Sequence, residues 1–387
     1  MSHPSAKLFV GLAASVALIS FPGCRSHHFP QHPSNYREFA YVSNGGSNTV
    51  SVYDVVNMRL DRELQVGQSP SGVTANPKRN EVYVVNSGGS QGSISVIDTE
   101  KNAVVATIPV HKQPYFLDVD KDGERAYVAN SGSNSVSVLD LGTRREIAEI
   151  HTGLGPGLAR ISPDGKSLVV TNRLGNSVTV IDAKSGQVRK TIDGCPGATD
   201  VVVMTDSTKA FAACSAGHQI MAITLGNSEG KQVAVEALLA VGRSPISLAL
   251  KPDGGELFVT NYDSDSISEV VTGTNDVGGA YMVGSRPVRG LVSPDNSLLY
   301  VSNFRSQELT VYSIDDGKRT GSIHVGDGPD ALAFSSDGYL LFVVDARSSD
   351  LAVIRTNTGT PNIGTLFTLL PTGRQPNAIA VKAFQQK

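Results

Sequence analysis

Short runs of alternating apolar and polar residues recur along most of the chain, separated by Gly, Pro, Asn and Asp. A box of the type Tyr-Val-x-Asn ends at residues 44, 86, 130, 172, 214, 261, 303 and 345. Successive boxes are 42 residues apart, except for one interval of 44 residues and one of 47. A fixed period of this length indicates one supersecondary unit copied in tandem. Because the runs are short and rich in Val, Ile, Tyr, Phe and Thr, each unit is expected to contain only β-strands.

The unit at residues 153–194 shows how one copy is expected to fold. Strands are predicted over residues 158–161, 168–171, 177–181 and 188–192. Pro163, Asp164 and Gly165 form a hairpin turn between the first two strands, and Asn172 ends the second, because an Asn side chain bonds the backbone two residues on. Four antiparallel strands joined by short turns make one blade of a propeller.

Four consecutive motifs run through residues 39–387: Tyr-Val-x-Asn, Ser/Thr-Val-x-Val-Ile-Asp, Val-Gly-x-x-Pro and Pro-Asp-Gly. They resemble the YVTN-family β-propeller repeat proteins, a group that includes surface-layer-like and exported bacterial propellers. The resemblance implies the fold, and it implies no ligand because the motifs consist of turn and core residues. WD40 and kelch repeats, and the propeller quinoproteins, rely on Trp, which this chain lacks.

The number of blades follows from counting boxes and innermost strands. There are eight boxes, and the innermost strands follow Pro70, Pro114, Pro156, Pro196, Pro245, Pro287, Pro329 and Pro376. The repeat begins at a second strand, around Tyr41, and ends with a first strand over residues 376–382. The sequence therefore predicts an all-β, eight-bladed β-propeller of four-stranded antiparallel blades, closed by pairing of the N- and C-terminal strands.

The first residues have a different character from the repeat. Lys7 precedes an apolar run over residues 8–20, which is too short to span a bilayer and typical of a signal peptide. Gly23 and Cys24 resemble the end of a bacterial lipobox, although Phe21 and Pro22 depart from it, so ordinary secretion is the alternative to lipidation of Cys24. The predicted organisation is a signal peptide over 1–23, a flexible tether over 24–38 and the propeller over 39–387.

Two further cysteines fall within one blade. Cys195 lies in the turn before a first strand, and Cys214 takes the place of the Asn that ends the second strand of the same blade. The start of the first strand and the end of the second lie close together in an antiparallel pair, so we expect a disulfide between Cys195 and Cys214. Two separate buried thiols are the alternative.

Composition excludes several kinds of site. The formal net charge of -3 argues against bulk attraction to nucleic acid or to an anionic membrane. The three Cys form no CxxC pair, so zinc ribbons and haem-attachment motifs are excluded. His111, His151 and His324 fall at outer strand ends of separate blades and are not expected to converge. The sequence thus predicts no catalytic residue, no metal site and no cofactor.

Arginines gather at the turns that should open at one end of the channel. The expected ligand-binding residues are Arg160, Arg173, Arg243, Arg286, Arg289, Arg305, Arg347 and Arg374. Because Arg binds carboxylate and phosphate with two parallel hydrogen bonds, we expect an anionic partner there: an envelope glycan, an acidic protein segment or single-stranded nucleic acid. Solvated arginines, or arginines paired with nearby Asp, are the alternative.

Two classes of function remain after these exclusions. The first is an exported, lipid-anchored binding or scaffolding module, monomeric and facing the periplasm or cell surface, with an envelope protein, glycan or other anionic ligand as its partner. The second is a propeller enzyme such as a lactonase-like hydrolase, or a haem d1-type cofactor-binding protein. Fold alone does not decide between them.

Overall fold

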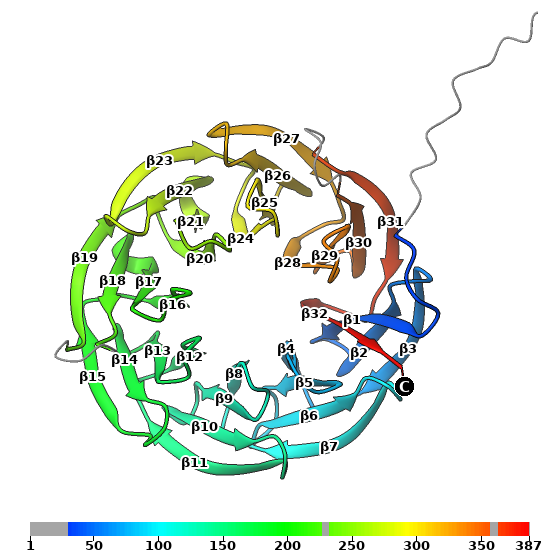
Figure 1. The fold of residues 1–387 in the computed structure, drawn as a ribbon, viewed down its shortest axis with the longest axis horizontal. Coiled ribbons are helices and arrows are strands. Elements are labelled where there is room, and N and C mark those ends of the chain that lie inside the picture. Colours follow the sequence, from blue (N-terminus) through cyan, green and yellow to red (C-terminus); the bar gives the residue numbers. More distant parts are fainter. Residues whose placement is uncertain (1–29, 227–231, 357–362, 387) are drawn as a thin grey trace, which may run out of the picture. The chain divides into compact units, whose positions relative to one another are not determined.

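The computed structural model describes residues 30–226, 232–356 and 363–386 of the chain. It divides into two units, residues 1–34 and residues 35–387. The second unit is a ring of eight four-stranded antiparallel sheets around a central channel (Figure 1), as the repeat predicts. Within the described residues no helix is long and apolar enough to cross a membrane.

Seven blades are built from four consecutive strands each, with the first strand innermost and the fourth outermost (Figure 1). Blades 1 to 4 contain β4 (Pro70–Ala75), β5 (Glu81–Asn86), β6 (Ser93–Asp98) and β7 (Ala103–Pro109); β8 (Pro114–Val119), β9 (Arg125–Asn130), β10 (Ser135–Asp140) and β11 (Arg145–His151); β12 (Pro156–Ile161), β13 (Ser167–Asn172), β14 (Ser177–Asp182) and β15 (Val188–Asp193); and β16 (Ala198–Val203), β17 (Lys209–Cys214), β18 (Gln219–Thr224) and β19 (Ala234–Ala240).

Blades 5 to 7 continue the same order. They contain β20 (Pro245–Leu250), β21 (Glu256–Asn261), β22 (Ser266–Val271) and β23 (Asp276–Met282); β24 (Pro287–Val292), β25 (Leu298–Asn303), β26 (Glu308–Ser313) and β27 (Lys318–His324); and β28 (Pro329–Phe334), β29 (Leu340–Asp345), β30 (Asp350–Arg355) and β31 (Thr365–Pro371). Two short 3₁₀ turns, η1 (Ser215–Gly217) and η2 (Tyr262–Ser264), follow the second strands of blades 4 and 5.

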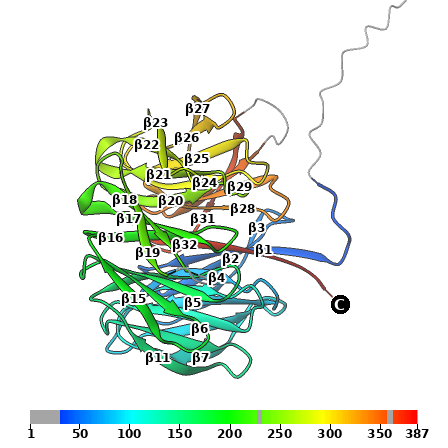
Figure 2. The ribbon, with the colours of Figure 1, turned by 60° about the vertical axis from the view of Figure 1, so that its left-hand side comes forward.

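Blade 8 is made from both ends of the chain, which confirms the predicted closure. Its order is β32 (Pro376–Gln385), β1 (Tyr36–Asn44), β2 (Thr49–Asp54) and β3 (Arg59–Gln65). β1 and β32 pair from Tyr36 opposite Gln385 to Asn44 opposite Pro376, and the pair extends beyond the ring edge (Figure 2). β1 thus begins at Tyr36, inside the segment 24–38 that the sequence assigned to a tether.

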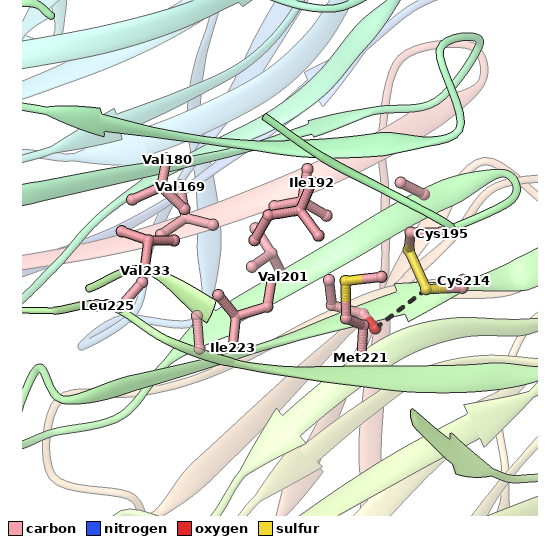
Figure 3. Packing of buried hydrophobic residues seen from close by; sticks show 14 of the residues in the cluster. Val169, Val180, Ile192, Cys195, Val201, Cys214, Met221, Ile223, Leu225 and Val233 are labelled. Atoms are coloured by element: carbon pink, nitrogen blue, oxygen red, sulfur yellow. Dashed lines mark hydrogen bonds between the residues drawn. A yellow bond between two sulfur atoms is a disulfide. The ribbon is translucent and has the colours of Figure 1, made fainter. Parts of the chain in front are cut away.

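The cores lie between neighbouring blades, because both faces of the middle strands are covered. The cluster between blades 3 and 4 combines Val169, Val180, Val201 and Met221, all buried (Figure 3). Second and third strands are buried along nearly their whole length, as in β13 and β14, whereas the outer β15 is largely exposed. This burial explains why the Tyr-Val-x-Asn boxes are the most regular part of the repeat.

In most blades the glycine of the Val-Gly-x-x-Pro turn (the turn glycine) packs against the Asn that ends the Tyr-Val-x-Asn box (the box Asn). In blade 3 the Asn172 amide donates to Ser177 and Thr179 hydroxyls at 3.1 and 2.8 Å. A Cβ on Gly153 would lie 2.7 Å from the Asn172 side chain, so only glycine fits above it. The same close approach to a box Asn occurs at Gly67, Gly242, Gly284 and Gly373, and Gly326 lies equally close to Asp345, which replaces the Asn in blade 7.

Blade 4 replaces this pair by two cysteines. Cys195 takes the glycine position and Cys214 the Asn position, and the structure joins them by a disulfide with both residues fully buried (Figure 3). In this blade the inner strand begins at Ala198 and not directly after Pro196, because Ala198 takes the place that proline has in the other seven blades.

Candidate ligand site at the channel mouth

Two kinds of turn lie together at one end of the ring, which we call the mouth face. These are the turn that connects one blade to the next and the turn between the second and third strands of a blade. In blade 6 the Phe304 amide donates to the Arg286 carbonyl at 2.9 Å, and in blade 8 the Gly46 amide donates to the Arg374 carbonyl at 2.9 Å. Turn residues distant in sequence are therefore neighbours on this face.

The second residue of every innermost strand reaches the channel. These eight residues, one for each blade, line two adjoining cavities at the mouth: Ser71, Tyr115, Gly157, Thr199, Ile246, Val288, Asp330 and Asn377. The ring of side chains is unequal in size and chemistry. Gly157 leaves the wall open at blade 3, since a Cβ there would meet only the Thr171 hydroxyl, at 3.4 Å.

The outer cavity has a volume of about 320 Å³ and combines arginines with an apolar wall. Arg173 comes from the turn after β13 and Arg289 from β24, three blades away around the ring. Leu158, Ile246 and Val288 supply the apolar surface. A deeper cavity of about 270 Å³ shares Tyr115, Leu158 and Arg289 with the first and adds Arg160. Ligand pockets in proteins usually have this mixture of apolar lining and a few placed polar groups.

Two carboxyl groups of the channel, those of Asp118 and Asp330, are partly buried beside arginines. Burial raises the pKa of Asp330, and the nearby Arg289 guanidinium opposes the rise. Burial likewise raises the pKa of Asp118, against the Arg160 guanidinium, which lies 3.5 Å away, and the Ile161 amide. Arg160 also lies over the Phe116 ring at 4.2 Å. Arg160 is therefore held in place, whereas Arg289 is an exposed side chain at the cavity wall.

Two of the acids near the channel connect blades. The Asp118 carboxylate accepts from the Ile161 amide of the next blade at 3.0 Å. The Asp200 carboxylate accepts from the Leu248 amide of the next blade at 2.9 Å. Neighbouring innermost strands share no backbone ladder, so such side chains join them. Both residues thus have structural roles that the sequence pattern does not distinguish from ligand binding.

The remaining predicted arginines lie outside the cavities, on the mouth face. Arg286 pairs with Asp263 and lies 4.8 Å from the centre of the Tyr262 ring. Arg347 lies 3.8 Å from Asp327 and 4.5 Å from the centre of the Phe304 ring. Arg243 donates to the Asp263 carbonyl at 2.9 Å. Arg305 and Arg374 are exposed. Of the eight arginines, the cavities thus use Arg160, Arg173 and Arg289.

Other predicted features have separate locations. Cys24 and the signal peptide lie outside the described residues. Among the residues that the structure does describe, no cluster of three or more His, Cys, Asp or Glu is arranged to hold a metal ion. His111 contacts Glu146 and Glu149 at 3.1 and 3.4 Å, away from the cavities.

Sequence reasoning did not identify the apolar side of the site or the stacked arginines. Tyr115, Ile246 and Val288 occupy a position at which the other blades have Ser, Gly, Thr, Asp or Asn. Tyr262 and Phe304 follow a box Asn, where no other blade has an aromatic residue. Comparing each position across the eight copies would have singled out both features, because the repeat itself does not require them.

Comparison with solved structures shows the same architecture at low sequence identity. Apo AztD from Citrobacter koseri is 16% identical, with coverage of 90% of this chain and 98% of that chain and a TM-score of 0.65. A putative 6-phosphogluconolactonase from Bacteroides fragilis NCTC 9343 is 15% identical, with coverage of 92% and 100% and a TM-score of 0.61. Dihydro-heme d1 dehydrogenase NirN is 16% identical, with coverage of 85% and 69% and a TM-score of 0.63.

Family sequence models match two parts of the chain, while no curated protein matches it. The lactonase model, described as a seven-bladed β-propeller, matches residues 43–159, although this ring has eight blades. The model described as the YNCE-like β-propeller matches residues 124–358, more than half of the chain. The chain therefore belongs to the YNCE-like β-propeller family.

Proposed function

We propose that this protein is a binding module of the cell envelope, which holds an anionic ligand at the channel mouth. The proposal includes the finer assignments made from sequence: the YVTN-type repeat, export by a lipoprotein signal peptide and attachment through Cys24. An envelope protein or a glycan is the expected source of the anionic group, and the propeller acts as a monomer.

The outer cavity carries this proposal. Arg173 and Arg289 approach it from different blades, and Tyr115, Leu158 and Ile246 cover its sides. Its volume of about 320 Å³ corresponds to roughly ten water molecules, which is enough for a small organic acid or the end of a larger one. A guanidinium at a partly apolar wall binds carboxylate or phosphate more strongly than the same group in bulk water, because the local dielectric is lower.

The binding test uses phenyl phosphate, which has an anionic group and an apolar ring, and a heparin oligosaccharide as a polyanion. Wild-type protein should bind phenyl phosphate in isothermal titration at low salt. The double variant Arg173→Gln/Arg289→Gln should lose at least tenfold in affinity, and Gly157→Leu should also lose binding because it fills the cavity without altering charge. Arg145→Gln/Lys318→Gln, on the outer strands β11 and β27, removes two exposed positive charges and is the charge-matched control.

Wild-type protein that binds neither probe would contradict the proposal. Heparin retention that survives in Arg173→Gln/Arg289→Gln but disappears in Arg286→Ser/Arg289→Ser/Arg305→Ser would move the anion site from the cavity to the surrounding turns. Equal binding by Gly157→Leu and wild type would show that the cavity is not occupied.

A hydrolase is the second candidate, because the lactonase family model matches residues 43–159. Asp330 and Arg289 line the outer cavity and have the chemistry to act on a lactone: a carboxyl whose pKa is raised by burial, and a cation beside it. Hydrolysis of phosphorylated and plain sugar lactones should be measured directly. Turnover that Asp330→Asn abolishes would favour this candidate over the binding module, and absorbance after incubation with haem d1 would test the cofactor-binding alternative.

Export and anchoring need an independent test. In a bacterial host fed an alkyne-tagged fatty acid, the wild-type protein should become labelled and fractionate with membranes. Cys24→Ser should abolish the label while the propeller stays folded. Labelling of the Cys24→Ser variant at the wild-type level would contradict lipidation at this residue.

A further inference from the structure

Two neighbouring blades carry a feature on the mouth face that the propeller repeat does not need. In blade 5 the residue after the box Asn is Tyr262, and in blade 6 it is Phe304. The corresponding residues of the other blades are Gly45, Ser87, Ser131, Arg173, Ser215 and Ala346. Since six blades fold without an aromatic ring at this position, the rings of blades 5 and 6 are not explained by folding.

Each ring is covered by an arginine that a carboxylate holds in place. The Arg286 guanidinium lies 4.8 Å from the Tyr262 ring centre and pairs with Asp263. Its backbone is fixed as well, because the Arg286 amide donates to Asp265 at 2.8 Å. A side chain fixed in this way loses little conformational entropy when a partner binds.

The second stack, one blade further on, combines the same residue types from exchanged turns: Arg347 follows the box of blade 7, and Asp327 lies in the turn between blades 6 and 7. The Arg347 guanidinium lies 4.5 Å from the Phe304 ring centre and 3.8 Å from Asp327. The Arg347 side chain is 46% exposed, so it remains open to a partner. Two neighbouring aromatic rings on the mouth face are thus each covered by an arginine that lies near a carboxylate.

Additional cations and an apolar side chain lie on the same blades. Arg243 and Arg305 are exposed, and neither forms an ion pair with a carboxylate of the described residues. Met282 ends β23, just before the turn that contains Arg286, and is 66% exposed. Tyr, Phe, Met and Arg are the residue types enriched in protein–protein interfaces.

From these observations we infer that the turns of blades 5 to 7 form a docking surface for an acidic, partly apolar segment of another protein. Carboxylates of the segment bind Arg243 and Arg305, and its apolar side chains cover Met282 and the exposed faces of the stacked guanidinium groups. The surface is separate from the cavity, so this inference does not depend on the proposed ligand there.

The chemistry favours a protein segment over a single-stranded nucleic acid. Bases bind single-strand sites by stacking on open aromatic faces. An arginine covers one face of each of the Tyr262 and Phe304 rings, so that face is closed to a stacking base. A peptide makes use of the same surface, because its apolar side chains cover the outer faces of the stacked guanidinium groups while its carboxylates bind the exposed Arg243 and Arg305.

The test uses a fluorescein-labelled 12-residue peptide of alternating Glu and Leu, and a fluorescein-labelled 7-nucleotide oligothymidylate, whose six phosphates match the six Glu carboxylates. In fluorescence anisotropy at low salt the peptide should bind wild-type protein, and rising salt should weaken it. Arg286→Gln/Arg347→Gln and Tyr262→Ser/Phe304→Ser should each lose at least tenfold in affinity. Lys112→Gln, at a turn of blade 2, and Arg173→Gln/Arg289→Gln should change it less than twofold.

Circular dichroism and the melting temperature establish that each variant is folded, which is expected because the altered side chains lie at surface turns. Absence of peptide binding at low salt would overturn the inference, and so would peptide affinity that is equal in wild type and both stack variants. Binding of the oligonucleotide with no binding of the peptide would replace the protein partner by a nucleic acid. If Arg173→Gln/Arg289→Gln alone abolished peptide binding, the site would be the cavity.

Discussion

Replacing Asp345 by Asn should stabilise the propeller, and the gain should grow with pH. Asp345 takes the place of the box Asn in blade 7 and lies opposite Asp350 in the register of β29 and β30. Burial and the Asp350 carboxyl raise the pKa of Asp345 to about 9 from its ordinary 3.8, although the Gly326 amide donates to it at 3.0 Å. The native protein therefore retains a proton on Asp345 at pH 7.

The magnitude follows from that shift. A group with a raised pKa in the folded state contributes its full stability below its unfolded pKa, and the contribution falls as pH rises toward the folded pKa. Each pH unit costs about 1.4 kcal/mol, so holding this proton at pH 7 costs up to about 4 kcal/mol. An Asn amide would donate to Asp350 without a proton from solvent, as the Asn172 amide donates to Ser177 and Thr179. We expect Asp345→Asn to raise the free energy of unfolding by about 2 to 4 kcal/mol at pH 7.

The assay is urea denaturation of wild type and Asp345→Asn between pH 4 and pH 8.5, followed by tyrosine fluorescence and circular dichroism. The two proteins should have nearly equal stability at pH 4 and diverge above it. The matched control is Asn303→Asp in blade 6, where the Asn303 amide donates to Thr310 at 2.9 Å; this variant should acquire the pH dependence that Asp345→Asn loses. Parallel pH profiles for wild type and Asp345→Asn would refute the proton retained on Asp345.

Three other predictions concern the fold. Deleting residues 376–387 removes β32 from blade 8 and exposes the edge of β1, so cooperative melting should be lost or the protein should aggregate; an unchanged melting curve would contradict closure by the two ends. Cys195→Gly/Cys214→Asn restores the pair used in most other blades and should fold with a loss of only about 3 kcal/mol, whereas thiol titration of the denatured, unreduced wild type should find neither Cys195 nor Cys214 free. Partial burial acts to raise the pKa of Glu236, but hydrogen bonds from Lys209, Thr224 and Asn275 lower it to about 2. Glu236→Gln should therefore destabilise the protein above pH 5 and have little effect near pH 2, where wild type has lost this contribution; a constant difference across that range would exclude the ionic contact.

The blade number and the ring closure could be predicted because they depend on local turn chemistry repeated at a fixed period. The box Asn, the turn glycine and the proline that begins the innermost strand each have a role within a single blade. They therefore recur at a fixed spacing in most of the eight copies, and the repeat can be recognised from the sequence. The start of β1 at Tyr36 was missed because Tyr36 to Glu38 pair only with the far end of the chain, at Gln385 to Ala383. Pairing between such distant segments leaves no local signal.

The site was harder to predict than the fold. The order of the turns along the chain was enough to predict that the arginines lie on one face. Which arginines line the cavity and which lie on the surface depends on the neighbouring side chains, which the order of the turns does not reveal. Arg286 and Arg173 both lie in turns of the mouth face, yet Arg286 stacks on Tyr262 and Arg173 lines the cavity. The apolar wall was missed because Tyr115, Ile246 and Val288 read as ordinary strand residues until the channel brings them together.

Blade 8 also sets the order in which the molecule can be completed. The Asn35 side chain donates to the Gln386 carbonyl across 351 residues. The first strand of the chain therefore cannot complete its pairing until the last strand is present. A polypeptide that emerges N-terminus first, from a ribosome or from a membrane channel, can form blades 1 to 7 one after another. Blade 8 stays incomplete until the C-terminal residues have emerged. Contacts of such long sequence separation form slowly, because the loop entropy is lost before the pairing is gained. During synthesis the protein therefore remains a curved, unsealed array whose strand edges need protection from other chains, and release of the C-terminus is the step that turns it into a ring.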